Sequence, residues 1–452
     1  MPNVWVVGGG LAGSEAAWQL AEAGLDVDLF EMRPGVPTGA HAGGGLAEVV
    51  CSNSLGSGLP DRASGVLIAE LRRMGSLLLE CAEKTRVPAG GALAVDRQSF
   101  SEAVTTTIES HPRIRLIREE ARRIPDGSGV LASGPLTSSA LASALRDFAG
   151  EDHLYFYDAL APIVEAASVD STIAFKASRY DRGQEEAGDY INCPMDEGEY
   201  RVFVGELARA ERIPLREFEE DIRTGVRAGP DKFFEGCLPV EILAERGEMT
   251  LAFGPLRPVG LADPRTGKRP FAVVQLRQDD QAASLYNLVG FQTNLTYAEQ
   301  DRVFRLIPGL GGARFVRHGQ MHRNTFVNAP KIVHASLETR QRPGLFLAGQ
   351  ITGVEGYLGN IATGLLAGVN LARRSSGQSS LVLPGTTMLG ALCRYVSEAS
   401  PEHFQPMKAA FGLLDTLPPG KKLGRRDRNR AYAARSANAL ADVWPEPMRI
   451  AT

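Results

Sequence analysis

The stretch that decides the fold reads Val4-Trp5-Val6-Val7-Gly8-Gly9-Gly10-Leu11-Ala12-Gly13. A short apolar run passes directly into a turn rich in glycine. Residues 14–23 then follow the pattern of a helix, and residues 27–31 follow that of a second strand. A strand, a glycine turn, a helix and a further strand in this order form a βαβ unit, so the sequence predicts an α/β fold.

The glycine spacing predicts that this unit binds a dinucleotide. Gly8 permits the tight turn, Gly10 lets the backbone approach a pyrophosphate, and Gly13 lets the helix pack closely on the strand. The phosphates would then lie at the positive end of the helix. Glu31 ends the second strand at about the offset, roughly 20 residues, expected of a carboxylate that binds an adenosine ribose. The cofactor-binding residues predicted here are Gly8, Gly9, Gly10, Leu11, Ala12, Gly13 and Glu31.

Two later strand-then-glycine edges predict that the nucleotide-binding domain is split. Residues 129–135 form one edge, which contains Gly134. Residues 344–350 form the other, which ends in Gly349 and Gln350 and is followed by Gly359 and a helix over about 361–374. Three such edges, at the start, middle and end, predict a Rossmann-like domain in two parts, residues 1–189 and 321–452, with an inserted α+β domain at 190–320.

Within the insertion we expect an acidic helix near 215–222 and strands near 249–253 and 271–276. Outside it we expect one helix within 65–84 and another over about 98–109.

The composition is that of an ordinary soluble globular protein. The 452 residues are 44% hydrophobic and 23% charged, and the length suggests two or three domains. No apolar run reaches the roughly 18 residues of a membrane span, and no signal sequence precedes the first strand. We therefore expect a cytoplasmic protein without a membrane partner.

The sequence has five cysteines, an odd number, which suits reduced thiols better than a set of disulfides. No two of them have CxxC spacing, which counts against a zinc site and against a dithiol redox centre. We expect no metal. Cys81 and Cys393 lie among leucines at helical spacing, which indicates core positions. Cys51 lies where apolar residues 46–50 give way to small polar ones, as at a strand end facing a cofactor. Cys237 lies in a turn, as either a packing residue or a reactive thiol.

A basic run near the end of the sequence contains Lys421, Lys422, Arg425, Arg426, Arg428 and Arg430. Such a run is usually a solvated helix face. In a chain of net charge −4, its local density also fits binding to a phosphate backbone.

Motifs spread over nearly the whole sequence resemble those of the folate- and FAD-dependent tRNA (uracil-5-)-methyltransferases. They include Gly10 to Ala17, Cys51-Ser52-Asn53-Ser54-Leu55, Lys176 to Asp181, Phe233 to Val240, Tyr286 to Leu295, Met321 to Thr325 and Gly349 to Tyr357. The sequence departs from the usual family pattern in the loop at Gly43–Gly45, after Leu55, and at Gly359-Asn360.

The resemblance implies an FAD-binding domain of the glutathione-reductase type with an insertion. It implies methylation of C5 of the T-loop uridine of tRNA, with methylenetetrahydrofolate as carbon donor, FAD as reductant, and NADH or NADPH to recharge the flavin. It also implies that Cys237 is the nucleophile that adds to uracil C6 and that Cys51 assists near the flavin.

Three alternatives are open at this stage. The first is the larger flavin enzyme that modifies the tRNA wobble uridine, although this sequence lacks its long helical C-terminal domain. The second is a pyridine-nucleotide disulfide reductase, against which the missing CxxC pair counts. The third is a flavin-bearing RNA-binding module without turnover.

Overall fold

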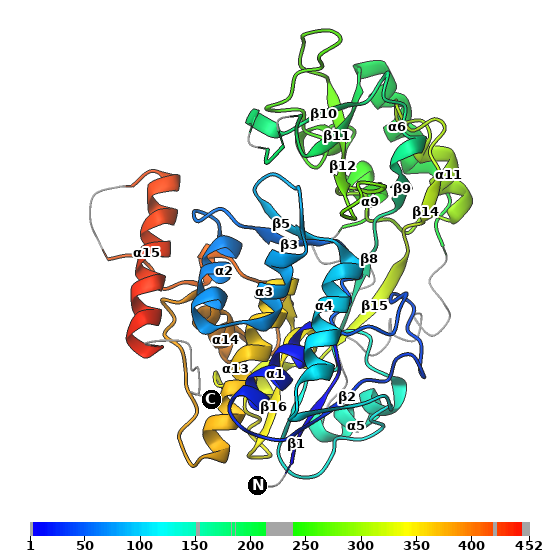
Figure 1. The fold of residues 1–452 in the computed structure, drawn as a ribbon. Helices are drawn as coiled ribbons and strands as arrows, with labels where there is room; N and C mark the ends of the chain where they lie inside the picture. The colour runs from blue at the N-terminus through cyan, green and yellow to red at the C-terminus, as the bar shows by residue number, and fades with distance from the viewer. Residues whose placement is uncertain are drawn as a thin grey trace.

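The computed structural model describes residues 3–150, 154–181, 183–185, 187–213, 238–418 and 423–444. Figure 1 shows a larger lower body, formed by the blue and the yellow-to-red segments, and a green upper body formed by the middle of the chain. Cys237, Lys421 and Lys422, together with the helix predicted at 215–222, lie outside the described residues. No helix within the described ranges is both long and apolar enough to cross a membrane.

The lower body is built on a five-stranded, fully parallel sheet with the strand order β16-β7-β1-β2-β6. The strands β1, β7 and β16 are buried on both faces, as parallel strands covered by helices are. The late strand β16 pairs with β7, which in turn pairs with β1, and this confirms that the predicted fold is split along the chain. The strands are β1 (Val4–Val7), β2 (Val27–Phe30), β6 (Ile114–Ile117), β7 (Gly129–Leu131) and β16 (Leu345–Leu347).

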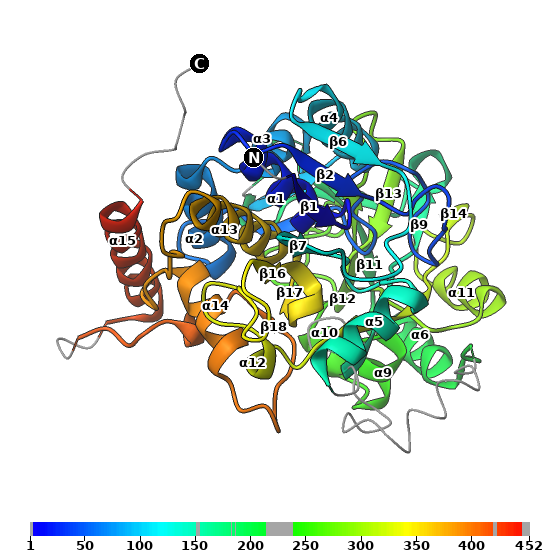
Figure 2. The ribbon, with the colours of Figure 1, turned by 90° about the horizontal axis from the view of Figure 1, so that it is seen from below.

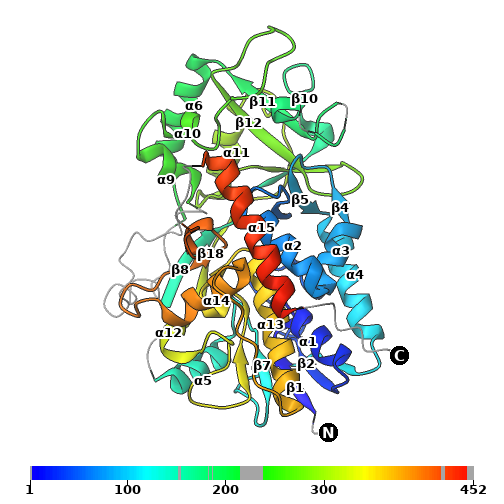
Figure 3. The same ribbon diagram turned by 90° about the vertical axis from the view of Figure 1, so that its left-hand side faces the viewer.

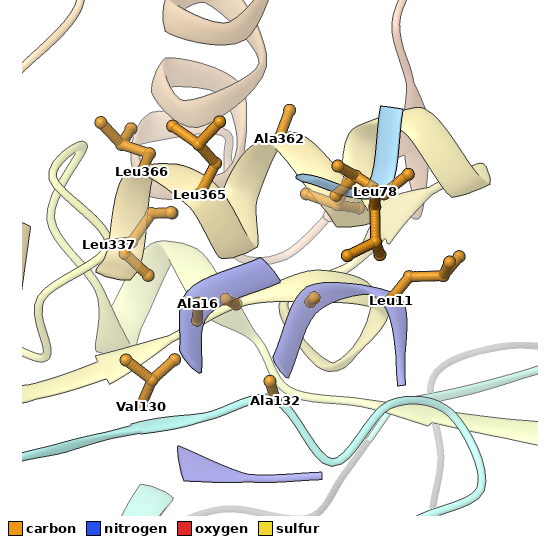
Figure 4. Packing of buried hydrophobic residues seen from close by; sticks show 14 of the residues in the cluster. Leu11, Ala16, Leu78, Val130, Ala132, Leu337, Ala362, Leu365 and Leu366 are labelled. Atoms are coloured by element: carbon orange, nitrogen blue, oxygen red, sulfur yellow. The ribbon is translucent and has the colours of Figure 1, made fainter. Parts of the chain in front are cut away.

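Two helices from distant parts of the chain pack closely on this sheet, α1 (Leu11–Glu22) and α13 (Tyr357–Ser375) (Figure 2). A Cβ atom on Gly364 of α13 would lie 2.1 Å from the Ala12 carbonyl oxygen, and one on Gly368 would lie 2.7 Å from that of Ala16. Only glycine therefore permits this approach. Figure 4 shows apolar residues around this contact, with Ala16 and Leu11 on α1 and with Leu365 and Ala362 on the side of α13 that is turned away from α1.

The remaining helices of the lower body pack around this pair. The segment predicted as one helix over 65–84 is two, because Gly75 takes the left-handed conformation (φ 76°) and ends α2. The strand expected before Cys51 is absent, since residues 46–50 form turns and loop in the described structure. The helices are α2 (Ala63–Met74), α3 (Leu77–Lys84), α4 (Arg97–Ser110), α5 (Ser139–Ala149), α12 (Ala329–Ile332), α14 (Met388–Glu398) and α15 (Arg425–Val443).

The upper body contains a six-stranded antiparallel sheet with the order β10-β11-β12-β13-β9-β14. Strands β9 and β10 precede residue 190 and yet belong to this sheet, so the sheet extends beyond the predicted insertion of 190–320; the division into domains stays a prediction. The strands are β9 (Ile163–Glu165), β10 (Phe175–Ala177), β11 (Tyr190–Met195), β12 (Ala272–Gln278), β13 (Leu285–Leu288) and β14 (Phe315–Arg317).

The helices of the upper body are α6 (Glu197–Arg209), α9 (Val240–Glu245), α10 (Thr250–Phe253) and α11 (Tyr297–Phe304). The prediction of a strand at 249–253 was wrong, because its apolar residues form the short helix α10. The chain enters the upper body through β8 (Leu154–Ala159) and returns through β15 (Met321–Phe326), and these two strands pair antiparallel (Figure 1).

Two small sheets complete the lower body. One has the order β3-β5-β4 and contains β3 (Ser54–Ser57), β4 (Arg86–Val87) and β5 (Ala92–Val95); the other pairs β17 (Val354–Glu355) with β18 (Met407–Lys408). The first strand of the three-stranded sheet begins at Ser54, three residues after Cys51, and therefore holds one end of the Cys51 loop.

The two faces of the six-stranded sheet differ in chemistry. Cys193, Val274 and Leu276 lie on the face that packs into the core of the upper body. The opposite face carries polar side chains in cross-strand register, among them Tyr190 opposite Arg277 and Asn192 opposite Gln275. A buried polar face needs hydrogen-bonding partners. The Tyr190 hydroxyl donates to the Ala89 carbonyl of the lower body, and Arg277 donates to Ser52 and Asn53 there, whereas Gln275 donates to Asn192 within the sheet.

Replacing Gly364 by alanine tests the helix contact. Alanine favours an isolated helix by about 1 kcal/mol over glycine, but here its Cβ would collide with the Ala12 carbonyl, so we expect a net loss of about 2 kcal/mol of stability. Thermal unfolding monitored by circular dichroism would show a lower midpoint. Gly412→Ala is the control, because its Cβ meets no described atom within 4 Å. A rise in midpoint for Gly364→Ala would contradict the tight packing.

Candidate functional site

A cavity of about 300 Å³ lies at the carboxyl ends of β1, β7 and β16, the edge where ligands bind in parallel α/β sheets. It is lined by eight of the residues predicted to bind a cofactor and by Cys51. Those eight are Gly8, Gly10, Leu11, Ala12, Glu31, Gly134, Gly349 and Gln350. Gly9, Gly13 and Gly359 do not line it.

The glycine turn is shaped by contacts of the backbone. Gly8 has φ 104°, and a Cβ on Gly13 would lie 1.7 Å from the Gly8 carbonyl oxygen, so both positions require glycine for packing. Gly10 differs, because its φ is −77° and a Cβ there would meet no described atom within 4 Å. The free space beside Gly10 belongs to the cavity.

Gly9 and Gly359 are packing positions. A Cβ on Gly9 would lie 2.5 Å from the Leu46 side chain, and one on Gly359 would lie 2.7 Å from that of Val354. Gly9 also donates its backbone N–H to Glu31 Oε2 at 2.9 Å, and so it fixes the carboxylate that faces the cavity.

Glu31 forms a buried ion pair with Arg33. Sequence analysis predicted Glu31 as a site residue but not Arg33. The Arg33 backbone N–H and Nε both donate to Glu31 Oε1 at 2.9 Å. Burial favours the neutral acid, but the hydrogen bonds and positive charge of Arg33 and the Gly9 N–H outweigh it, and the pKa of Glu31 is lowered. Arg33 also donates to Glu48 and to the Gly45 carbonyl, which ties the Gly43–Gly45 loop to the cavity wall.

Two helix amino ends border the cavity. α1 follows Gly10 and α13 follows Gly356, and in neither does a described side chain cap the free backbone N–H groups. Helix amino ends carry partial positive charge and attract anions. Asn360, in the first turn of α13, lines the cavity, and its buried Oδ1 has no hydrogen-bond partner among the described residues. The arrangement suits a ligand with anionic groups at two separated places.

The Cys51 loop is held by α13. The hydroxyl oxygen of Tyr357 accepts the backbone N–H groups of Cys51 at 2.9 Å and Ser52 at 3.1 Å. Burial is the main cause that raises the pKa of the Tyr357 hydroxyl, and the neighbouring Cys51 raises it further. The Cys51 thiol donates to the Ala159 carbonyl at 3.5 Å. This sulfur is thus placed on the cavity wall.

A polar network joins the Cys51 loop to the upper body. Arg277 of β12 donates to Ser52 Oγ at 2.6 Å and to Asn53 Oδ1 at 2.9 Å. Asn53 is fully buried and donates to the Gln278 carbonyl at 2.8 Å. From the other side, Arg97 pairs with Asp279 at 2.9 Å and donates to the Val49 carbonyl at 2.6 Å. The loop is therefore held between the two bodies.

The other described cysteines lie in the cores, as predicted for Cys81 and Cys393. Burial raises the pKa of Cys81 to about 11 and that of Cys193 and Cys393 to about 12, so these thiols stay protonated. Within the described ranges, no three His, Cys, Asp or Glu side chains come together as a metal site would require.

The basic segment forms α15, which crosses α2 on one side of the lower body (Figure 3). Asn429 donates to the Asp61 carbonyl at 3.1 Å, and Ser436 donates to Glu70. The structure describes four of the residues predicted to bind RNA, and all four are exposed: Arg425, Arg426, Arg428 and Arg430. Arg426 lies 3.4 Å from Asp61, and Arg430 lies 3.9 Å from Asp427.

Sequence analysis missed four residues of this site: Arg33, Tyr357, Asn360 and Arg277. Arg33 stands two positions after Glu31, where its charge could have indicated an ion pair. The other three are brought in by long-range packing, which no local pattern encodes.

The comparisons with known proteins concern nearly the whole chain. Residues 3–379 match the family described as glucose inhibited division protein A. A protein of Heliobacterium modesticaldum named methylenetetrahydrofolate–tRNA-(uracil-5-)-methyltransferase TrmFO is 54% identical over 445 residues, 98% of each chain. Proteins of the same name from Moorella thermoacetica and Brevibacillus brevis are 54% and 50% identical, over 98% of this chain and 97% and 99% of theirs.

Among solved structures, GidA of Aquifex aeolicus in its form I crystal superposes with a TM-score of 0.69 at 16% identity. The alignment covers 98% of this chain and 75% of that one. At this identity the likeness concerns the fold, and it agrees with the split α/β architecture.

Replacing Glu31 by glutamine tests the buried ion pair. We expect a loss of about 2 kcal/mol of stability at neutral pH, because a charged acceptor of the Gly9 and Arg33 N–H groups is removed. The pKa of Glu31 lies below its ordinary 4.5, so this stabilisation is present above pH 4.5 and is lost as the pH falls through the folded-state pKa.

Denaturant unfolding of wild type and Glu31→Gln across this pH range measures the difference. The difference in the free energy of unfolding between wild type and Glu31→Gln should become smaller as the pH falls. Glu22→Gln is the control, because Glu22 is exposed and pairs only with His111 at 3.3 Å among the described residues. A stability difference that does not vary with pH would contradict the stabilising role of the ionised Glu31 carboxylate.

Proposed function

The chain belongs to the family of methylenetetrahydrofolate–tRNA-(uracil-5-)-methyltransferases, TrmFO, and we propose that it methylates C5 of the T-loop uridine of tRNA. The observation that carries the proposal is the near-complete match to relatives of that name, together with a cysteine, Cys51, on the wall of the cavity that α1 and α13 border. The carbon donor is methylenetetrahydrofolate. We propose FAD as the reductant and NADH or NADPH as the source of its electrons.

The polar groups of the cavity support the proposal that it binds FAD. Gly10 leaves open space at the amino end of α1, where a pyrophosphate would accept the free N–H groups of the first turn. Glu31 is ionised and faces the cavity, so it can accept from ribose hydroxyls. The amino end of α13 and Asn360 Oδ1, which has no hydrogen-bond partner among the described residues, would meet the flavin ring.

The remaining cofactor-binding residues would act through backbone and amide groups. Gly349 has φ 78° and carries Gln350 into the cavity, where the Gln350 amide donates to Glu355 at 2.7 Å. Gly134 has φ 70° and also lines the cavity. When bound, FAD supplies the reducing equivalents that convert the transferred carbon to a methyl group.

The protein must activate uracil, because C5 is a weak nucleophile. We assign to Cys237 the addition of a thiolate to C6, which makes C5 enolate-like and able to attack the methylene carbon of the folate. Loss of the C5 proton then expels tetrahydrofolate and leaves a methylene group on C5. This group takes up the reducing equivalents as a hydride and becomes methyl as the Cys237 thiolate leaves C6. Cys51 would assist, since the Tyr357 hydroxyl and Arg277 hold its loop against the cavity.

The tRNA would be held outside the cavity by positive charge. The exposed arginines of α15, with Lys421 and Lys422, would bind the RNA backbone. The target base must leave the folded T-loop to reach a buried reactive centre, so the backbone has to be held while the base is extruded.

Replacing Gly10 by valine should give colourless protein, because the branched side chain would occupy the space of the pyrophosphate. The backbone of Gly10 suits valine and no described atom lies near its Cβ, so the fold should survive. The flavin absorbance per protein measures occupancy. Gly312→Val is the control, because Gly312 also has open space around its Cβ and stands in the upper body. A yellow Gly10→Val protein would place the cofactor elsewhere.

The decisive experiment incubates the protein with tRNA, methylenetetrahydrofolate and reduced nicotinamide nucleotide and asks for 5-methyluridine in the T-loop. Cys237→Ala and Cys51→Ala should lose nearly all product, and Cys237→Ala should keep flavin and tRNA binding. Cys81→Ala and Cys393→Ala should lose stability but retain turnover, because both are core residues.

RNA with 5-fluorouridine at the target assigns the two roles. Fluorine at C5 blocks the proton loss that normally frees the enzyme, so the sulfur that attacked C6 stays bound. We expect an adduct on Cys237 by mass spectrometry. An adduct on Cys51 would exchange the roles, and a product at the wobble position would overturn the proposed function.

A further inference from the structure

Tyr180 is an exposed aromatic residue in a strained backbone conformation. Its φ and ψ are 57° and 30°, in the left-handed region that bulky residues seldom adopt, and 56% of the residue is exposed. It stands in the motif Lys176 to Asp181, to which no role has been assigned. Strain of this kind persists only where the surrounding contacts enforce it, and it occurs often at binding sites.

The contacts around Tyr180 hold its ring outward. Its backbone N–H donates to the Gly260 carbonyl at 2.9 Å, and a Cβ on Gly260 would lie 3.0 Å from the tyrosine ring. Below it, Arg179 donates to the Gln275 side chain at 2.8 Å and to the carbonyls of Arg257 and Val259. The ring therefore has a fixed place on the surface of the upper body.

Positive charge gathers beside the ring. Burial lowers the pKa of Arg179, and the nearby guanidinium of Arg257 lowers it further, while Tyr180 and Tyr190 act in the opposite direction. Arg257 is exposed and has no ion pair among the described residues. Two adjacent guanidinium groups with no carboxylate paired to them in the described part of the chain are a favourable place for an external anion.

This surface is connected to the Cys51 loop through one strand. Gln275, which accepts from Arg179, and Arg277, which donates to Ser52, lie two residues apart on the same face of β12. At a rise of about 3.3 Å per residue, their backbones are about 7 Å apart. Tyr190, on the neighbouring strand, lies opposite Arg277 in the same row.

We infer that Tyr180, Arg179 and Arg257 form a docking surface for the RNA strand next to the target uridine. The Tyr180 ring stacks on an unpaired base, and the two guanidinium groups bind a backbone phosphate. Stacking on an aromatic face with cations beside it is the usual way in which single-stranded RNA is held. The inference rests on the proposed function for the identity of the RNA, but the surface is separate from the cavity and from α15.

Binding of a T-arm RNA hairpin by fluorescence anisotropy tests the surface. Tyr180→Ala should weaken binding about tenfold, whereas Tyr180→Phe keeps the ring and should bind like wild type. Tyr180→Gly should also lose affinity, yet unfold no earlier than wild type, because glycine relieves the backbone strain. Arg257→Gln should reduce the slope of log affinity against log salt by roughly 0.7 for one phosphate.

Matched controls separate the surface from general effects. Phe253→Ala removes another exposed aromatic ring of the upper body, and Arg123→Gln removes another exposed cation. Neither should change affinity. Equal binding by wild type and Tyr180→Ala, or equal weakening by Phe253→Ala, would overturn the inference.

The formation of 5-methyluridine distinguishes this inference from the proposed function. If wild type forms the product and Tyr180→Ala binds as tightly as wild type, only the docking surface is wrong. If the binding pattern is as expected but wild type forms no product, only the proposed methylation is wrong. If wild type binds no RNA, both are wrong.

Discussion

The close approach of α1 and α13 is the contact on which the cavity depends. Their axes can come together only because Gly364 and Gly368 present bare backbone to Ala12 and Ala16. The contact places the first turn of α13 beside the glycine turn that precedes α1, so the positive ends of both helices face one space. A single packing constraint thus gathers residues 8–12 and residues 349–360, which lie far apart in the sequence, into one wall.

The upper body is joined to that wall by polar contacts. Burying a guanidinium is costly unless its N–H groups are satisfied, and Arg277 meets this need with Ser52, Asn53 and Asn287. The same bonds fix the loop of Cys51, which the Tyr357 hydroxyl holds from α13. A shift of the six-stranded sheet would therefore move Cys51 relative to the cavity, so both bodies determine the position of this sulfur.

The sequence predicted the features that local patterns encode. The glycine turn, the three parallel strand edges and the core positions of Cys81 and Cys393 were correct, because each follows from short spacing or apolar periodicity. The expected strand at 249–253 was wrong, since a run of four or five apolar residues suits a helix as well as a strand. Tyr357 and Asn360 could not be found, because their place in the site follows from the α1–α13 contact.

Buried carboxylates extend this long-range order to the helix that carries the basic segment. Glu70 of α2 accepts the free N–H groups of Met388 and Leu389 at the start of α14, and it also accepts the Ser436 hydroxyl of α15. Burial raises the pKa of Glu70, although these hydrogen bonds oppose that effect. One carboxylate thereby joins three helices. Because α15 is fixed in this way, its exposed arginines form a preordered surface, and an anionic partner that binds there need not order the backbone that carries them.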